Sequence, residues 1–260
     1  MPPCYVAAHP TPQGTSGPSA DHPADLDQPG ALPTEARKDL RLRSGARAVL
    51  AAGITHPLAW LVGLVVWPTN LDVRASDATV LSTYAGSAAP AAVQASLVHG
   101  VAGIALAVVT IGLARTARVA SAGRTARLIL GAGLAAAATS LIQWALDLRL
   151  ALAVAPSGDA GSAGAVLTGI DRLDGVKMLL LAGSALGGLL LGRWTAARWL
   201  TAVSAALALT IAISGIGYLV LIPPLASLAF VSGPLLLIWV PTVAVVAWHA
   251  ARHHSSRLDH

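Results

Sequence analysis

The stretch Arg115-Thr-Ala-Arg118-Val-Ala-Ser-Ala-Gly123-Arg124-Thr-Ala-Arg127 decides the fold, because it lies between two long apolar segments. No Asp, Glu, Lys or Arg occurs from Ala78 to Ala114 before it, or from Leu128 to Leu146 after it. Each segment is long enough to cross the ~30 Å hydrocarbon core of a bilayer as an α-helix. Four arginines in a short turn between two such segments are typical of a cytoplasmic connection between transmembrane helices.

The composition places the chain in the membrane class. Only 11% of its 260 residues are charged and 55% are hydrophobic, whereas soluble domains carry about 25% charged residues. Helix surface that faces lipid carries charge only at high cost, which explains the deficit. The net charge of +5 does not indicate nucleic-acid binding, because the basic residues lie in flanks and turns that set topology. A single cysteine, Cys4, excludes a disulfide within the chain and a cysteine-ligated metal centre.

The two ends of the chain differ in composition from the middle. Residues 1–36 hold eight of the sixteen prolines and almost no aliphatic side chains, so they are predicted to be disordered. A basic collar follows at 37–47, and residues 1–45 are interpreted as a cytoplasmic tail. The tail either docks a cytoplasmic protein partner or is dispensable, for example through a misplaced start codon. Residues 251–260 form a short basic tail.

Charge-free segments, prolines and turn residues predict an all-α membrane domain of six transmembrane helices over residues 46–250. The loop at 69–90 is expected to be extracytoplasmic with a short interfacial helix, and residues 150–170, rich in Gly, Ser, Ala and Pro, are expected to form a flexible outer loop. Pro223-Pro224 separates the last two helices. The predicted helices cover residues 46–68, 91–114, 126–148, 171–192, 198–221 and 226–249.

The distribution of basic residues predicts that both termini are cytoplasmic. With six helices, thirteen Lys and Arg residues fall on the cytoplasmic side and four fall outside, namely Arg74, Arg149, Arg172 and Lys177. Five or seven helices break this asymmetry, which is the main determinant of membrane topology. The chain is therefore expected in a plasma membrane, in contact with lipid, with both ends inside.

Two histidines, His56 and His99, lie within predicted spans at similar depth on neighbouring helices. Polar groups inside a membrane are costly, so each is a candidate site together with Gln143. One interpretation is a proton relay, a metal site or a haem held by the two histidines. The favoured interpretation is a hydrogen bond from each histidine to a neighbouring helix, with neither haem nor another cofactor and with no metal.

Acidic side chains gather at the outer ends of the third and fourth predicted helices. Asp171, Asp174 and Lys177 are spaced three apart and share one helix face, and Asp147 ends the preceding span. The favoured interpretation is an ion network that positions the two helices. The alternative is an outward-opening cavity for a small polar or cationic solute. On the same fourth helix, Gly183 and Gly187 are four apart and predict close packing against another helix.

The carboxyl-terminal half carries a pattern of small residues and prolines: Arg198-Trp199-Leu200, then Ser214-Gly215-Ile-Gly217, then Pro234-Leu-Leu-Leu-Ile-Trp239. This pattern resembles a widespread group of uncharacterised bacterial, largely actinobacterial, six-helix integral membrane proteins. The resemblance covers about residues 46–250 and implies six helices in the plasma membrane. It implies no activity and no site residues.

The sequence contains no catalytic motif, so a non-enzymatic role is expected: a membrane scaffold, or the partner of a second copy or of a cytoplasmic protein bound through residues 1–45. The alternative is a small-solute or proton-coupled transporter or channel that uses His56, His99 and the outer carboxylates. A haem or metal redox protein is the remote alternative.

Overall fold

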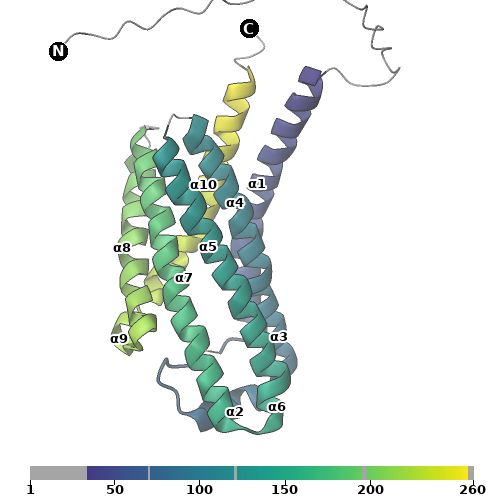
Figure 1. Ribbon diagram of the computed structural model, residues 1–260, viewed down its shortest axis with the longest axis vertical. Helices are drawn as coiled ribbons and strands as arrows, with labels where there is room; N and C mark the ends of the chain where they lie inside the picture. Colours follow the sequence, from purple (N-terminus) through teal and green to yellow (C-terminus); the bar gives the residue numbers. More distant parts are fainter. Residues whose placement is uncertain (1–33, 70, 120–121, 195–197, 257–260) are drawn as a thin grey trace, which may run out of the picture.

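The computed structural model describes residues 34–69, 71–119, 122–194 and 198–256, with side chains over 44–69, 71–119, 122–190 and 198–251. All the regular secondary structure in these ranges is helical, which confirms the all-α prediction (Figure 1). Six helical segments of the described chain are long and apolar enough to cross a membrane, as predicted. They are Ser44–Val66, Ala88–Val119, Gly123–Ser157, Ala160–Leu190, Arg198–Val220 and Pro223–Ala251.

Three of the six spans are made of more than one helical element. The second span joins α3, the π-helix η1 and α4, and the third joins α5, the π-helix η2 and α6. The elements in chain order are α1 (Thr34–Val66), α2 (Asp77–Ala85), α3 (Ala88–Ala95), η1 (Ser96–Val101), α4 (Ala102–Val119), α5 (Gly123–Arg149), η2 (Leu150–Val154), α6 (Ala155–Ser157), α7 (Ala160–Trp194), α8 (Arg198–Val220), α9 (Pro223–Ala226) and α10 (Ala229–Ser256).

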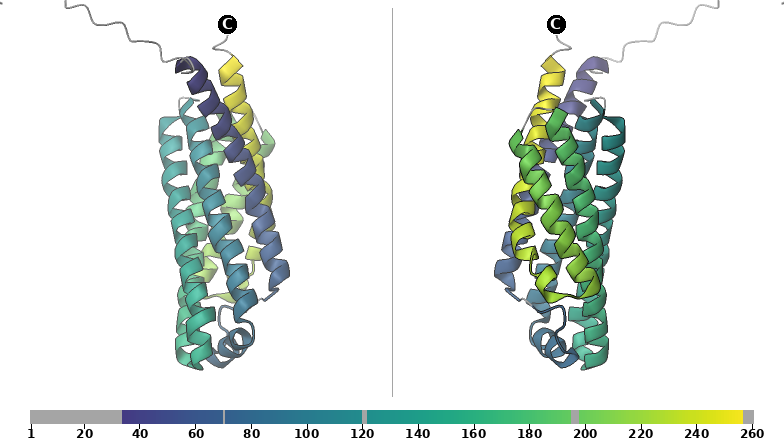
Figure 2. Two further views of the ribbon diagram at one scale, coloured as in Figure 1. Left: turned by 90° about the vertical axis from the view of Figure 1, so that its right-hand side faces the viewer. Right: turned by 90° about the vertical axis from the view of Figure 1, so that its left-hand side faces the viewer.

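The long helices form a closed ring in which each packs against its neighbour in sequence. α1 packs on α4, α4 on α5, α5 on α7, α7 on α8 and α8 on α10, and α10 returns to pack on both α1 and α4 (Figures 1 and 2). The start of α1 and the end of α10 lie at the same end of the bundle (Figure 1). The short helices α2, α6 and α9 lie toward the opposite end.

The helices of the ring differ in length. α7 has 35 residues and α8, which follows it after a short connection, has 23. At 1.5 Å per residue, α7 therefore extends about 18 Å beyond the far end of α8. The third span is equally long at 35 residues. The extensions of α3, α5–α6 and α7, with α2 packed on α7, form a helical cap at this end (Figure 1).

The prediction of a flexible loop at 150–170 is wrong, because these residues are helical apart from Gly158 and Asp159. The helix reverses at Gly158, whose φ of 77° lies in the left-handed region open to glycine. The segment is ordered by burial, since it forms the cap core with α2. This core contains Val80, Tyr84, Ala91, Leu150, Ala151, Val154, Ala155, Ala163 and Ile170. Tertiary packing here outweighs the weak helix propensity of Gly and Ser.

Other boundaries move by smaller amounts. α1 begins at Thr34, so the basic collar at 37–47 is the first part of a helix rather than the end of a tail. The expected short helix within 69–90 is α2, which begins after Ser76, whose side chain accepts a hydrogen bond from the Thr79 amide at 3.2 Å. The predicted fourth span began at Asp171, and α7 supplies the missing length by starting at Ala160. The predicted disorder of residues 1–36 falls almost wholly outside the described residues.

Candidate functional site

A polar layer crosses the bundle between two apolar cores. It comprises His56, His99, Gln143, Asp147, Asp171, Asp174 and Lys177, all among the residues singled out from the sequence. On one side lies the cap core, which includes Leu150 and Ile170. On the other side a larger core runs along α1, α4, α5, α7, α8 and α10.

Helix contacts place this layer near the ends of the shorter helices. A Cβ added to Gly63 would meet Val98 and Leu97, so the last turn of α1 lies beside the residues just before His99. A Cβ added to Gly175 would lie 2.7 Å from the Leu219 amide nitrogen, so Asp174 lies level with the last turn of α8. The layer is therefore at the boundary between the membrane-length part of the bundle and the cap.

Gln143 connects α5 to α7 at the centre of the layer. Its side chain is fully buried, and its amide nitrogen donates to the carbonyl of Ile170 at 3.2 Å and to Oδ1 of Asp174 at 3.0 Å. Both partners are acceptors, which fixes the orientation of the amide group. Asp174 also forms an ion pair with Lys177, whose Nζ lies 2.5 Å from the same oxygen. One carboxylate oxygen thus serves a helix contact and an ion pair.

His99 and Asp147 connect α5 to the second span. His99 Nε2 lies 3.5 Å from Asp147 Oδ2. The Ser140 hydroxyl, two turns before Asp147 on α5, donates to the backbone carbonyl of His99 at 3.1 Å. The Trp144 indole donates to the Ser96 hydroxyl at 3.1 Å. Three contacts therefore hold the η1 segment against α5.

Both helical partners change to π-helix at the layer. η1 (Ser96–Val101) contains His99, and η2 (Leu150–Val154) begins three residues after Asp147. A π-helical segment widens the helix and inserts about one extra residue, and such segments are frequent at functional sites. The insertion changes which face of the helix each following residue occupies. Helix periodicity alone therefore gives the wrong face for residues beyond the segment.

His56 meets the same region from α1. Its Nδ1 lies 3.0 Å from the carbonyl oxygen of Ala102, directly after η1. Because a carbonyl only accepts, Nδ1 carries the proton and Nε2 is the acceptor of the neutral ring. His56 is 3% exposed, so this acceptor is buried. The two histidines thus have different partners, a backbone carbonyl and a carboxylate.

Three buried atoms of the layer have no hydrogen-bond partner among the described residues: His56 Nε2, His99 Nδ1 and Gln143 Oε1. Gln143 Oε1 is an acceptor by its chemistry, and His56 Nε2 is one by its tautomer. With Nε2 of His99 facing a carboxyl oxygen, Nδ1 of the neutral ring is an acceptor too. Buried polar atoms normally have partners, so each of these three atoms is a position where a hydrogen-bond donor could bind.

The charges of the layer are unequal. The layer contains three carboxyl groups, those of Asp147, Asp171 and Asp174, and one ammonium group, that of Lys177, which pairs with Asp174, while the histidines are neutral in the tautomers described. Tyr84 of α2 belongs to the cap core next to the layer, where it is 6% exposed and stacks edge-on against Trp67. Burial, together with the carboxylates of Asp147 and Asp171, raises the pKa of the Tyr84 phenol. The layer thus has more carboxyl groups than ammonium groups and lies near the Tyr84 ring.

The glycines predicted to pack helices lie on α7 away from the layer. A Cβ on Gly183 would be 3.3 Å from Cβ of Ala132, and one on Gly187 would overlap Ile129, so both glycines face α5. Gly175, where the α7 backbone closely approaches another helix, was not among the glycines singled out from the sequence. Its α7 backbone meets Gly215 of α8, and the small-xxx-small spacing that locates such sites is absent around Gly175.

Sequence reasoning also missed Ser140, Tyr84 and the Ala102 carbonyl. Ser140 precedes Gln143 by three residues and shares its helix face, which is a usable signal. Every residue has a backbone carbonyl, so the sequence does not show which one accepts a hydrogen bond from a side chain. Among the described residues, no group of three or more His, Cys, Asp or Glu side chains is arranged to hold a metal ion.

Comparisons with protein-family models, with curated proteins and with solved structures give no match to this chain. The resemblance to actinobacterial six-helix membrane proteins remains a prediction.

Proposed function

We propose that this chain is a multi-pass membrane protein that carries a small positively charged hydrogen-bond donor, a hydrated proton or an ammonium-type cation, through the polar layer. The observation that supports the proposal is the set of three buried, unpaired acceptors on His56, His99 and Gln143. A donor-rich cation satisfies acceptors, and the excess of carboxylates over ammonium groups in the layer attracts it. A neutral donor also satisfies the acceptors but lacks the attraction of the carboxylates, which repel an anion.

The proposed orientation has both ends in the cytoplasm and the cap outside the plasma membrane. The support is the positive-inside rule, since the 115–127 turn with its four arginines lies at the end opposite the cap. The layer then opens, when α2 moves, toward the outside. The solute enters from the outer face and meets Asp147 and Asp171 first.

The inner half of the bundle favours a carrier over an open channel. Leu113, Ile129, Leu207 and Val243 are almost completely buried in the core between the layer and the arginine end. A tightly packed apolar core offers no continuous polar route. Movement of a solute to the inner side therefore requires a rearrangement of helices, as in alternating access.

Proteoliposomes that contain the full chain and a pH-sensitive dye test this proposal. With an imposed membrane potential, the protein is expected to carry protons faster than empty liposomes. An outward ammonium gradient separates ammonium transport from proton transport.

Asp147→Asn is expected to reduce the flux at least about tenfold, because it removes a charge of the layer. Asp159→Asn, on an exposed connection of the cap, is the matched control and is expected to keep the flux. Flux equal to that of empty liposomes for every cation contradicts the proposal.

A membrane scaffold is the second candidate. It is favoured by the Gln143–Asp174 hydrogen bond, which joins α5 to α7, and by the Ser140–His99 hydrogen bond and the His99–Asp147 contact, which join α5 to η1; such contacts within one chain suit a positioning role. A scaffold that binds a cytoplasmic partner through residues 1–45 predicts co-purification that is lost when residues 1–36 are deleted. A homo-oligomer predicts a larger mass in detergent. The haem alternative predicts a Soret band in the purified protein, and a colourless preparation contradicts it.

A further inference from the structure

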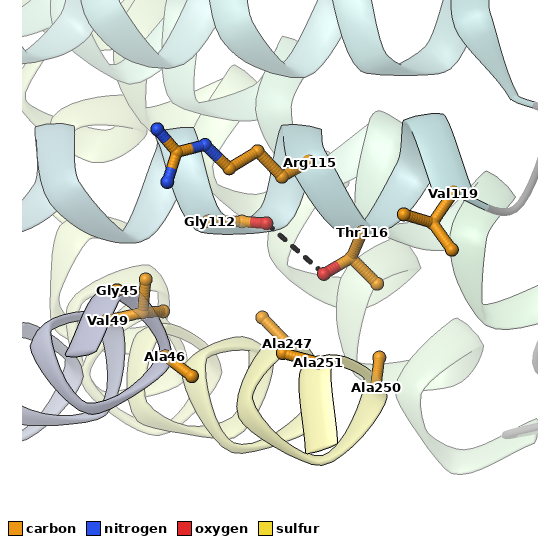
Figure 3. A pocket seen from close by; sticks show the side chains of 10 residues that line it. All are labelled: Gly45, Ala46, Val49, Gly112, Arg115, Thr116, Val119, Ala247, Ala250 and Ala251. Carbon is orange, nitrogen blue, oxygen red and sulfur yellow. Dashed lines mark hydrogen bonds between the residues drawn. The ribbon is translucent and has the colours of Figure 1, made fainter. Parts of the chain in front are cut away.

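We propose that a groove at the arginine end of α1, α4 and α10 binds an anionic phospholipid, with the phosphate at Arg115 and an acyl chain between the helices. We call it the arginine-end groove. It lies at the far end of the bundle from the polar layer, and the proposal is independent of cation transport. The cavity has a volume of about 140 Å³. Its lining consists of Gly45, Ala46, Val49, Gly112, Arg115, Thr116, Val119, Ala247, Ala250 and Ala251 (Figure 3).

The groove exists because small residues face one another where α1 and α10 pass α4. The α10 side is made of alanines and the α1 side begins with Gly45 and Ala46. Thr116 does not make the groove polar, because its hydroxyl donates to the Gly112 carbonyl at 3.2 Å within α4 (Figure 3). The lining is therefore hydrocarbon, apart from one side chain.

That side chain is Arg115, which is exposed and extends from α4 over α1 (Figure 3). Its Nη1 lies 3.8 Å from where a Cβ on Gly45 would be, so the guanidinium stands at the rim of the apolar space. The segments 44–66, 88–119 and 229–251, which form the groove, contain no Asp or Glu. An anion for Arg115 must therefore come from outside these segments.

A phospholipid supplies both parts that the groove lacks. The lining residues fall at the ends of three membrane spans, where lipid phosphates meet protein. Arg115 offers the planar guanidinium that pairs with phosphate oxygens in a bidentate manner. The apolar lining takes hydrocarbon, which free phosphate does not have. An anionic headgroup is preferred over a zwitterionic one, because choline adds a positive charge beside the guanidinium.

Native mass spectrometry of the full chain in detergent, with dioleoylphosphatidylglycerol, dioleoylphosphatidylcholine or inorganic phosphate added, tests the proposal. Phosphatidylglycerol adducts are expected to exceed phosphatidylcholine adducts. Arg115→Gln is expected to lower phosphatidylglycerol occupancy about fivefold, the usual effect of one basic residue near a membrane surface. Arg127→Gln is the matched control, since Arg127 is exposed at the same end on α5 but does not line the groove.

A second variant separates the groove from the charge. Ala250→Leu fills the groove without changing Arg115, and it is expected to reduce phosphatidylglycerol occupancy as well. The proposal is overturned if Arg115→Gln and Arg127→Gln reduce occupancy equally, which indicates a diffuse basic surface. It is also overturned if phosphatidylcholine binds as well as phosphatidylglycerol, or if inorganic phosphate binds and the lipid does not.

Discussion

Gln143 of α5 donates a hydrogen bond to Asp174 of α7 at 3.0 Å, and this contact joins two long helices inside the bundle. The same Asp174 oxygen pairs with Lys177. Removal of one partner from a buried ion pair leaves the other charge without compensation, at a cost of about 3–5 kcal/mol. We expect Lys177→Met to lower the free energy of unfolding by about this amount, whereas Asp174→Asn with Lys177→Met costs less than the sum of the single changes.

Unfolding in mixed detergent micelles, followed by circular dichroism, measures this cycle. A double variant whose loss equals the sum of the single losses contradicts the coupling of Asp174 with Lys177. Lys177→Arg keeps the charge and is the conservative control.

The packing of α7 on α8 depends on the absence of a side chain at Gly175. A Cβ there would lie 2.6 Å from the Gly215 carbonyl oxygen and 2.7 Å from the Leu219 amide nitrogen. Both are backbone atoms, so the helices must separate to admit a methyl group. We expect Gly175→Ala to lower the free energy of unfolding by about 1–3 kcal/mol, as overpacking does.

Gly169 provides a control on the same helix, because a Cβ there has no heavy atom within 4 Å. Gly169→Ala is expected to leave stability unchanged or raise it by up to about 1 kcal/mol through helix propensity. Equal effects of the two substitutions on thermal unfolding in detergent would show that α7 and α8 do not touch at Gly175.

The fold is largely predictable from where charges are absent. Long charge-free segments separated by prolines and arginines give five of the six spans, because the hydrocarbon core excludes charge, whereas the predicted fourth span begins with the charged side chains of residues 171–177. The helices at 150–170 were missed because their stabilisation comes from α2, which is distant in sequence. Gly, Ser and Pro locally indicate a loop, but burial of Leu150 and Ile170 against Val80 and Tyr84 decides otherwise.

The candidate site was predictable in its residues but not in its pairings. A spacing of three placed Asp171, Asp174 and Lys177 on one helix face. His99 contacts Asp147 from the π-helix η1, and the spacing of residues in a sequence does not predict where a π-helix forms. His56 contacts the backbone carbonyl of Ala102. Because every residue has a backbone carbonyl, the sequence does not predict this partner.

Leu221 adopts an unfavourable backbone conformation at the end of α8. Its φ of 56° makes it the non-glycine residue with positive φ in the described chain. The conformation lets the Ile222 amide donate to the Gly217 carbonyl at 2.8 Å, and the Leu221 carbonyl accepts from Arg74 Nε at 2.8 Å. This left-handed conformation costs a side-chain-bearing residue about 1–2 kcal/mol.

Leu221→Gly is expected to raise the free energy of unfolding by up to about 1 kcal/mol, since glycine adopts this conformation readily. Thermal unfolding in detergent measures the change. A decrease for Leu221→Gly would mean that contacts of the leucine side chain outweigh the relief of strain.

The cap over the polar layer predicts alkaline sensitivity through Tyr84. Burial and the nearby carboxylates of Asp147 and Asp171 raise the pKa of Tyr84 above its usual value of about 10. The folded state therefore keeps the phenol proton at a pH where the unfolded state has lost it. The stabilisation from Tyr84 is complete below about pH 10 and is lost as pH rises further, with a slope approaching 1.4 kcal/mol per pH unit.

Tyr84→Phe removes the ionisable phenol and therefore removes this slope. Free energies of unfolding of the wild type and Tyr84→Phe, measured from pH 8 to 11.5, are expected to run parallel up to about pH 10 and then converge or cross. Parallel curves over the whole range would mean that Tyr84 ionises equally in both states, and α2 then does not seal the layer from water.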